Sequence, residues 1–154
     1  MFPESTICKM DRLLQRIGAP VPPGYWSLDI RIKQREWNGI GSDSGALKYL
    51  VGPANTFLSW MLAASLPHDI WWGIKNDGTR ETFERSNSEW KETCYKLADD
   101  SFGWIPFKGI RETLRNARKF EARRGWKILM SDDCWKVFQD SAQVEEGPEV
   151  QDGV

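Results

Sequence analysis

The stretch from Phe57 to Lys75, FLSWMLAASLPHDIWWGIK, constrains the fold of this chain more than any other. Its apolar residues recur at intervals of three and four, which is typical of a helix with one buried face. His68, the only histidine of the chain, lies on that same face, and Asp69 follows it directly. Ionisable side chains on a buried face are costly unless polar partners satisfy them. The stretch therefore predicts a central helix that ends near Gly73 and needs polar neighbours around His68.

Length and charge indicate one soluble domain. With 154 residues, of which 40% are hydrophobic and 28% charged, we expect a single globular domain over residues 1–140. Residues 141–154 hold four acidic and no basic side chains, so we expect this tail to be ordered only by a partner. The net charge of −1 gives no clear signal for binding nucleic acid. We also expect no signal peptide and no transmembrane segment, because no suitable apolar run is present.

The cysteines indicate the compartment in which the protein is made, and the tryptophans indicate which residues form its core. Cys8, Cys94 and Cys134 are an odd number and widely spaced, which indicates buried, reduced thiols in a protein made inside a cell. Nine tryptophans are many for this length. We expect most of them in the core, because an indole buries a large apolar area, and we expect Trp71 or Trp72 to expose a ring.

Further elements are predicted on both sides of the central helix. An amphipathic helix over residues 7–17 ends at Gly18. The alternation of apolar and polar side chains over residues 26–33 predicts a short half-buried strand near the N-terminus. A helix over residues 82–98 places five residues on one buried line: Phe83, Asn87, Trp90, Cys94 and Leu97.

The C-terminal third is expected to hold one more long helix. It spans residues 107–124, ends at Gly125 and buries four side chains: Phe107, Ile110, Leu114 and Ala117. The sequence WKILM then predicts a short strand or extended segment, and Ser131 caps a last turn of helix. The predicted class is mostly α with minor β.

The pair of His68 and Asp69 allows a chemical and a structural interpretation. An imidazole can act as a general base if a second group fixes its tautomer, and Asn87 on the next helix can be that group. Asp69 can bind a hard cation such as Ca²⁺ together with oxygens of the glycine-rich loop NGIGSDSGA, which carries Asp43. The alternative roles are a buried hydrogen-bonded pair, a turn residue at Asp43, and a cap or backbone partner at Asn87.

The segment AASLPHDIWW resembles the His-Asp helix of the phospholipase A2-like proteins. More widely, residues 39–126 resemble a family of small phage-encoded proteins of unknown function that share this helix. The segments that carry the resemblance follow in the family's order: IGSDSGA, AASLPHDIWW, RSNSEW and ARRGW. The resemblance implies a pair of packed helices with His68 as general base, Asp69 as the Ca²⁺ ligand near Asp43, and Asn87 where the phospholipase pattern has a supporting acid.

The resemblance also implies a biological setting. It suggests a virion- or tail-associated bacteriophage protein, made in the host cytoplasm, with an active or degenerate lipid-ester hydrolase site that uses Ca²⁺. The implied partners are other phage structural proteins and a phospholipid surface. An asparagine cannot stabilise an imidazolium as a carboxylate would, so a non-catalytic structural or adaptor protein of the particle is the alternative. An inhibitor that binds a host protein is a further one.

A basic strip accompanies the predicted helix over residues 107–124. Its members are Arg111, Arg115, Arg118 and Lys119, with Arg123 and Arg124 beyond them. Such a strip suits contact with the phosphates of lipids or nucleic acid, but it also suits an ordinary solvated helix face. Docking of the acidic tail of a neighbouring subunit is a third interpretation.

Overall fold

The computed structural model describes residues 2–37 and 59–142. Six α-helices and two short 3₁₀ helices make up this part of the chain, and it contains no strand. The predicted mostly helical class is confirmed, whereas the minor β component is absent from the described residues.

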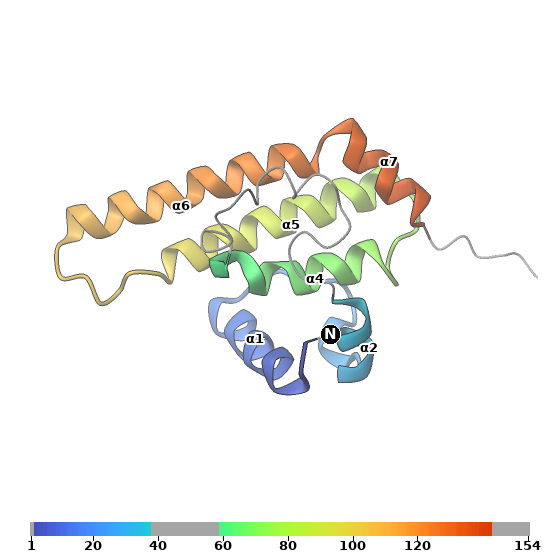
Figure 1. Cartoon of the computed structure of the whole chain (residues 1–154), viewed down its shortest axis with the longest axis horizontal. Coiled ribbons are helices and arrows are strands. Elements are labelled where there is room, and N and C mark those ends of the chain that lie inside the picture. Colours follow the sequence, from blue (N-terminus) through green and yellow to red (C-terminus); the bar gives the residue numbers. More distant parts are fainter. Residues whose placement is uncertain (1, 38–58, 143–154) are drawn as a thin grey trace, which may run out of the picture.

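Three helices that run back and forth form the centre of the molecule. The short 3₁₀ helix η2 (Ser59–Met61) leads into α4 (Leu62–Trp72), and α5 (Arg80–Asp99) and α6 (Lys108–Leu129) follow. Helix α5 lies between α4 and α6 and contacts both (Figure 1). Gly73 ends α4 as predicted. The predicted buried line of α5 is confirmed in full, because all five of its residues are buried.

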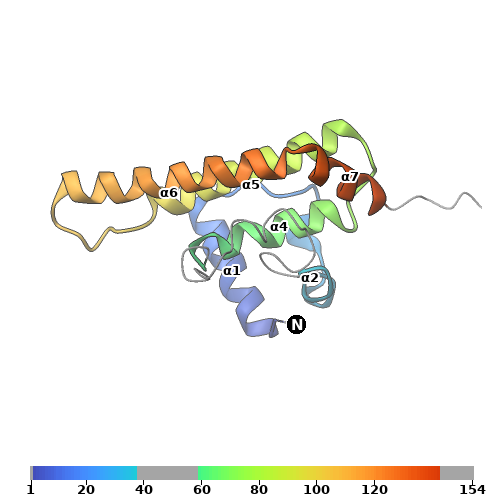
Figure 2. The same ribbon diagram turned by 45° about the horizontal axis from the view of Figure 1, so that its top comes forward.

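The N-terminal elements cover the side of α4 that faces away from α6. They are α1 (Glu4–Ile17), the 3₁₀ helix η1 (Tyr25–Ser27) and α2 (Ile30–Glu36). Both α1 and α2 contact α4 (Figures 1 and 2). Gly18 ends α1 as predicted, with a φ of 65° that a residue without a Cβ adopts without strain.

The predicted strand over residues 26–33 is wrong, because residues 30–36 form α2. The Asp29 side chain accepts a hydrogen bond from the Arg31 N–H at 2.7 Å and so caps a helix start. Helical spacing then buries Lys33 and Trp37, which lie four residues apart. Four alternating apolar residues are too short a pattern to exclude a helix.

Helix α6 starts where it was predicted, within one residue, but extends further than predicted at its C-terminal end. It continues through Gly125 to Leu129, so the predicted strand or extended segment WKILM is helical up to Leu129. Gly125 is buried, as are Ala122 and Leu129 of the same helix. The last helix, α7 (Asp132–Asp140), begins as predicted with Ser131 as its cap.

The predicted burial at the start of α6 is also wrong. Phe107 and Ile110 are exposed by 66% and 55%. Ala117 is exposed as well, and Leu114 is only half-buried. Opposite the last turn of α5, Lys119 pairs with Asp99 at 2.6 Å. The first turns of α6 therefore extend beyond the end of α5, where no described helix covers them (Figure 1).

Two further expectations about burial need correction. Cys94 and Cys134 are buried, but Cys8 is exposed. Trp71 is only 5% exposed because its indole N–H donates to Glu89 at 2.6 Å, and the half-buried Trp72 donates to Ser86 at 3.0 Å. The exposed tryptophans in the described part are Trp26 and Trp104.

Candidate functional site

His68 on α4 faces Asn87 on α5. Its Nε2 atom lies 2.8 Å from Asn87 Oδ1. The amide nitrogen of Asn87 donates to the carbonyl oxygen of Leu129, at the end of α6, at 3.1 Å. Because that carbonyl can only accept, it fixes the orientation of the amide and leaves Oδ1 toward the imidazole. The proton of neutral His68 is therefore on Nε2, and Nδ1 is the acceptor nitrogen.

Burial decides the charge of this histidine. The side chain of His68 is 7% exposed, and the rings of Trp72 and Trp90 lie 4.9 Å and 6.5 Å from its own. Removal from water disfavours the imidazolium and lowers the pKa of His68 to about 4, although the hydrogen bond with Asn87 acts in the opposite direction. His68 is thus uncharged at neutral pH.

Only one of the two predicted calcium ligands lies in the part of the chain that the structure describes. Asp69 follows His68 on α4 and is half-buried. Asp43 lies outside the described residues. Across residues 2–37 and 59–142, no cluster of three or more His, Cys, Asp or Glu side chains could hold a metal ion. The described residues alone do not make the site that Ca²⁺ prefers, with its six to eight oxygen ligands.

Much of the predicted basic strip holds the connection between α5 and α6. The guanidinium groups of Arg115 and Arg118 donate to the backbone oxygen and the hydroxyl of Ser101 at 2.8 Å and 2.7 Å. Arg111 donates to the backbone oxygen of Ile105 at 3.2 Å. These three arginines have a structural role, whereas Arg123 and Arg124 are exposed to solvent.

A polar cluster that the sequence did not reveal joins α1, η1 and α2. Asp11 accepts hydrogen bonds from the Tyr25 hydroxyl and from the Lys33 ammonium group, both at 2.6 Å. Lys33 is 4% exposed, and its Nζ lies 4.0 Å from the centre of the Tyr25 ring. Burial and the neighbouring Asp11 raise the pKa of Tyr25. These residues are far apart in sequence, so no local spacing predicts the cluster.

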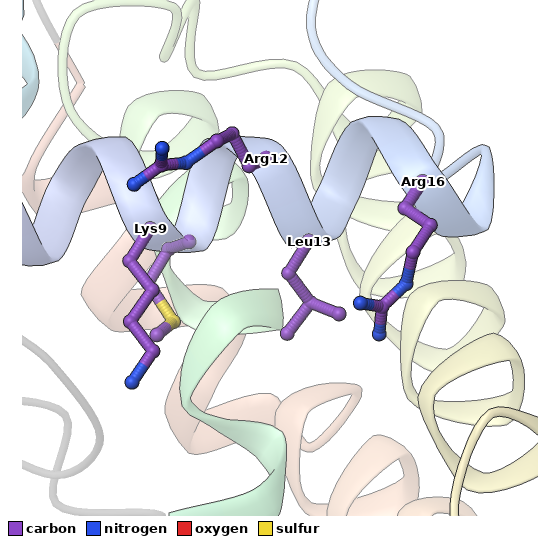
Figure 3. Close-up of a pocket in the computed structure, with 5 residues that line it drawn as sticks. Lys9, Arg12, Leu13 and Arg16 are labelled. Carbon is purple, nitrogen blue, oxygen red and sulfur yellow. The ribbon is translucent and has the colours of Figure 1, made fainter.

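A cationic pocket of about 560 Å³ lies on α1 and is lined by Lys9, Met10, Arg12, Leu13 and Arg16 (Figure 3). Arg16 is partly engaged, because it pairs with Asp100 at 2.6 Å. Lys9 and Arg12 are exposed, so the pocket offers positive charge without a buried polar group to orient a ligand. Neither His68 nor Asn87 lines it.

No protein-family model matches the chain, and neither a curated protein nor a solved structure matches it significantly. Among the described helices, none combines the length and the apolar character needed to cross a membrane.

Proposed function

We propose that this protein is a non-catalytic structural or adaptor protein of a bacteriophage particle. The observation that carries the proposal is the chain of hydrogen bonds from His68 through Asn87 to the Leu129 carbonyl. It joins α4, α5 and the end of α6 inside the core, where the polar atoms of Asn87 serve other protein atoms. The phage setting comes from the sequence resemblance.

The chemistry of Asn87 supports a structural role for the pair. An imidazole that acts as a general base becomes positively charged when it takes a proton, and a neighbouring carboxylate would stabilise that charge. Asn87 is neutral, and the burial that lowers the pKa of His68 opposes the charged form further. In this proposal, α4 and α5 correspond to a phospholipase A2-like helix pair that is kept as a scaffold.

Two measurements on the full chain test the proposal. We expect calorimetric titration with Ca²⁺ to show no binding, and we expect no turnover of phosphatidylcholine or phosphatidylglycerol vesicles. The matched variant is His68→Gln, since a glutamine amide can still donate a hydrogen bond to Asn87. Hydrolysis by the native protein that disappears in His68→Gln would contradict a non-catalytic role.

A lipid-ester hydrolase is the second candidate, and one observation favours it. The hydrogen bond to Asn87 leaves Nδ1 of His68 unprotonated, which is the state that a general base requires. In such an enzyme Nδ1 would take a proton from water while Asn87 orients the ring. General-base catalysis typically contributes a factor of about 10²–10⁴, so a loss of that size in His68→Gln would select this candidate.

A further inference from the structure

The connection between α5 and α6, together with the first turn of α6, exposes three large apolar side chains. Trp104, Phe107 and Ile110 are 82%, 66% and 55% exposed. We call these three residues the tip. They lie where the chain turns from α5 into α6, at an end that projects past the other helices in both views (Figures 1 and 2). Apolar side chains gathered in one exposed place mark an interaction surface.

Side chains of α6 hydrogen-bond to the backbone of the connection that carries the tip. Arg111 donates to the Ile105 carbonyl, Arg115 donates to the Ser101 carbonyl, and Ile105 itself is only 8% exposed. Phe102 adopts a φ of 64°, a left-handed conformation that is strained for a bulky residue. The connection is therefore ordered. It buries the side chain of Ile105 and exposes the rings of Trp104 and Phe107 to solvent.

Positive charge accompanies the tip. Between residues 101 and 117 the sequence has three cationic side chains, Lys108, Arg111 and Arg115, and one carboxylate, Glu112. Arg111 and Arg115 hydrogen-bond to carbonyl oxygens, and neither forms a salt bridge with a carboxylate of the described residues. No carboxylate of the described residues therefore neutralises these two charges, and Lys108 beside them is exposed.

We propose that the tip inserts into the headgroup region of an anionic phospholipid bilayer. Tryptophan and phenylalanine are favoured at the boundary between water and hydrocarbon, and lysine and arginine next to them reach the lipid phosphates. This is shallow insertion of side chains and needs no membrane-spanning helix. It complements both the apolar and the cationic character of residues 104–115.

The size and shape of the tip favour a bilayer over a protein partner. Burial of the exposed parts of its three side chains would cover at most roughly 500 Å², since a whole aromatic side chain buries about 150–250 Å². A stable protein interface takes about 800 Å² from each partner. Lipids, in contrast, surround a projecting end without needing a matching concave surface.

Co-sedimentation with vesicles tests this proposal. The full chain is mixed with vesicles of phosphatidylcholine alone or of phosphatidylcholine with phosphatidylglycerol. We expect binding to the anionic vesicles that weakens as salt is raised, and a loss of at least tenfold in the double variant Trp104→Ser/Phe107→Ser. The matched control is Trp26→Ser, which removes an exposed tryptophan elsewhere and should leave binding unchanged.

Three results would overturn the proposal. They are no binding of the native protein to anionic vesicles, equal binding by the double variant, and a lipid-free dimer that the double variant loses, since a second copy would then cover the tip. The single variant Phe107→Ser repeats the test if the double variant misfolds by circular dichroism. His68→Gln should bind vesicles like the native protein, so the outcome is independent of whether the protein hydrolyses lipids.

Discussion

At the scale of single residues, burial of His68 makes the stability of the protein depend on pH. The pKa of this imidazole is about 4 in the folded protein and about 6.5 in the unfolded chain. Between these values the unfolded chain binds a proton that the folded protein does not, so stability falls as the pH is lowered. From pH 6.5 to pH 5 the expected loss is about 1.5 kcal/mol.

Urea unfolding of native protein and His68→Gln across this pH range measures the effect. Most carboxylates titrate below pH 5, so the difference between the two proteins isolates the histidine. The native protein should lose stability more steeply than His68→Gln on acidification. Parallel curves above pH 5 would show that His68 is not buried in its neutral form.

The substitution Asn87→Asp restores the carboxylate that the phospholipase pattern has at this position. Its effect on stability follows from the hydrogen bonds that the Asn87 amide makes. In Asn87→Asp, an oxygen replaces the group that donates to the Leu129 carbonyl at 3.1 Å, and a charge enters the core. We expect a loss of about 2–4 kcal/mol at pH 7 by chemical denaturation. Ser88→Asp adds the same charge at an exposed neighbouring position and should change stability by less than about 0.5 kcal/mol. Equal effects of the two substitutions would contradict the assigned hydrogen bonds.

At the scale of elements, the start of α2 depends on one cap. Asp29 accepts the Arg31 N–H at 2.7 Å, so Asp29→Ala should cost about 1 kcal/mol in thermal or urea unfolding. Asp29→Asn keeps an accepting oxygen and should cost much less. If residues 26–33 formed a strand instead, the two substitutions would have similar effects.

The sequence predicts best those elements whose apolar line has a covering partner along its whole length. Helix α5 is packed on two sides by α4 and α6, so the line from Phe83 to Leu97 is buried as its spacing indicates. The start of α6 has the same kind of spacing, yet Phe107 and Ile110 are exposed. Periodicity indicates which face is apolar, but it does not show whether another helix reaches that face.

The candidate site was predictable in part for a related reason. His68 and Asn87 each lie on a buried helix line, so their meeting follows once α4 packs against α5. The third member, the Leu129 carbonyl, does not follow from the sequence, because the pattern of residues 126–130 predicts a short strand or extended segment there. Asp11, Tyr25 and Lys33 meet only through the packing of three separate elements, which no local pattern encodes.

At the scale of the whole molecule, the Asp11 cluster holds the N-terminal layer together. Removing the carboxylate in Asp11→Ala leaves the buried ammonium of Lys33 without its anion, which should cost about 3–5 kcal/mol in denaturant unfolding. The double variant Asp11→Leu/Lys33→Met removes both charges and should recover much of that loss.

A surface pair provides the comparison. Arg16 and Asp100 also lie 2.6 Å apart, but both side chains are exposed, so Arg16→Ala should cost at most about 1 kcal/mol. A similar loss in Arg16→Ala and Asp11→Ala would show that burial does not distinguish the two ion pairs.

The uninterrupted course of α6 has a geometric consequence. Its 22 residues, at 1.5 Å each, span about 33 Å. The tip lies at one end, and α7 lies at the other, where the side chain of Asn76 donates to the Phe138 carbonyl at 2.8 Å (Figure 1). The described chain thus ends at Ala142, far from the tip. If the tip contacts a membrane as proposed, α6 would hold α7 roughly 33 Å from that surface, so the length of this helix would set the distance between the two ends of the molecule.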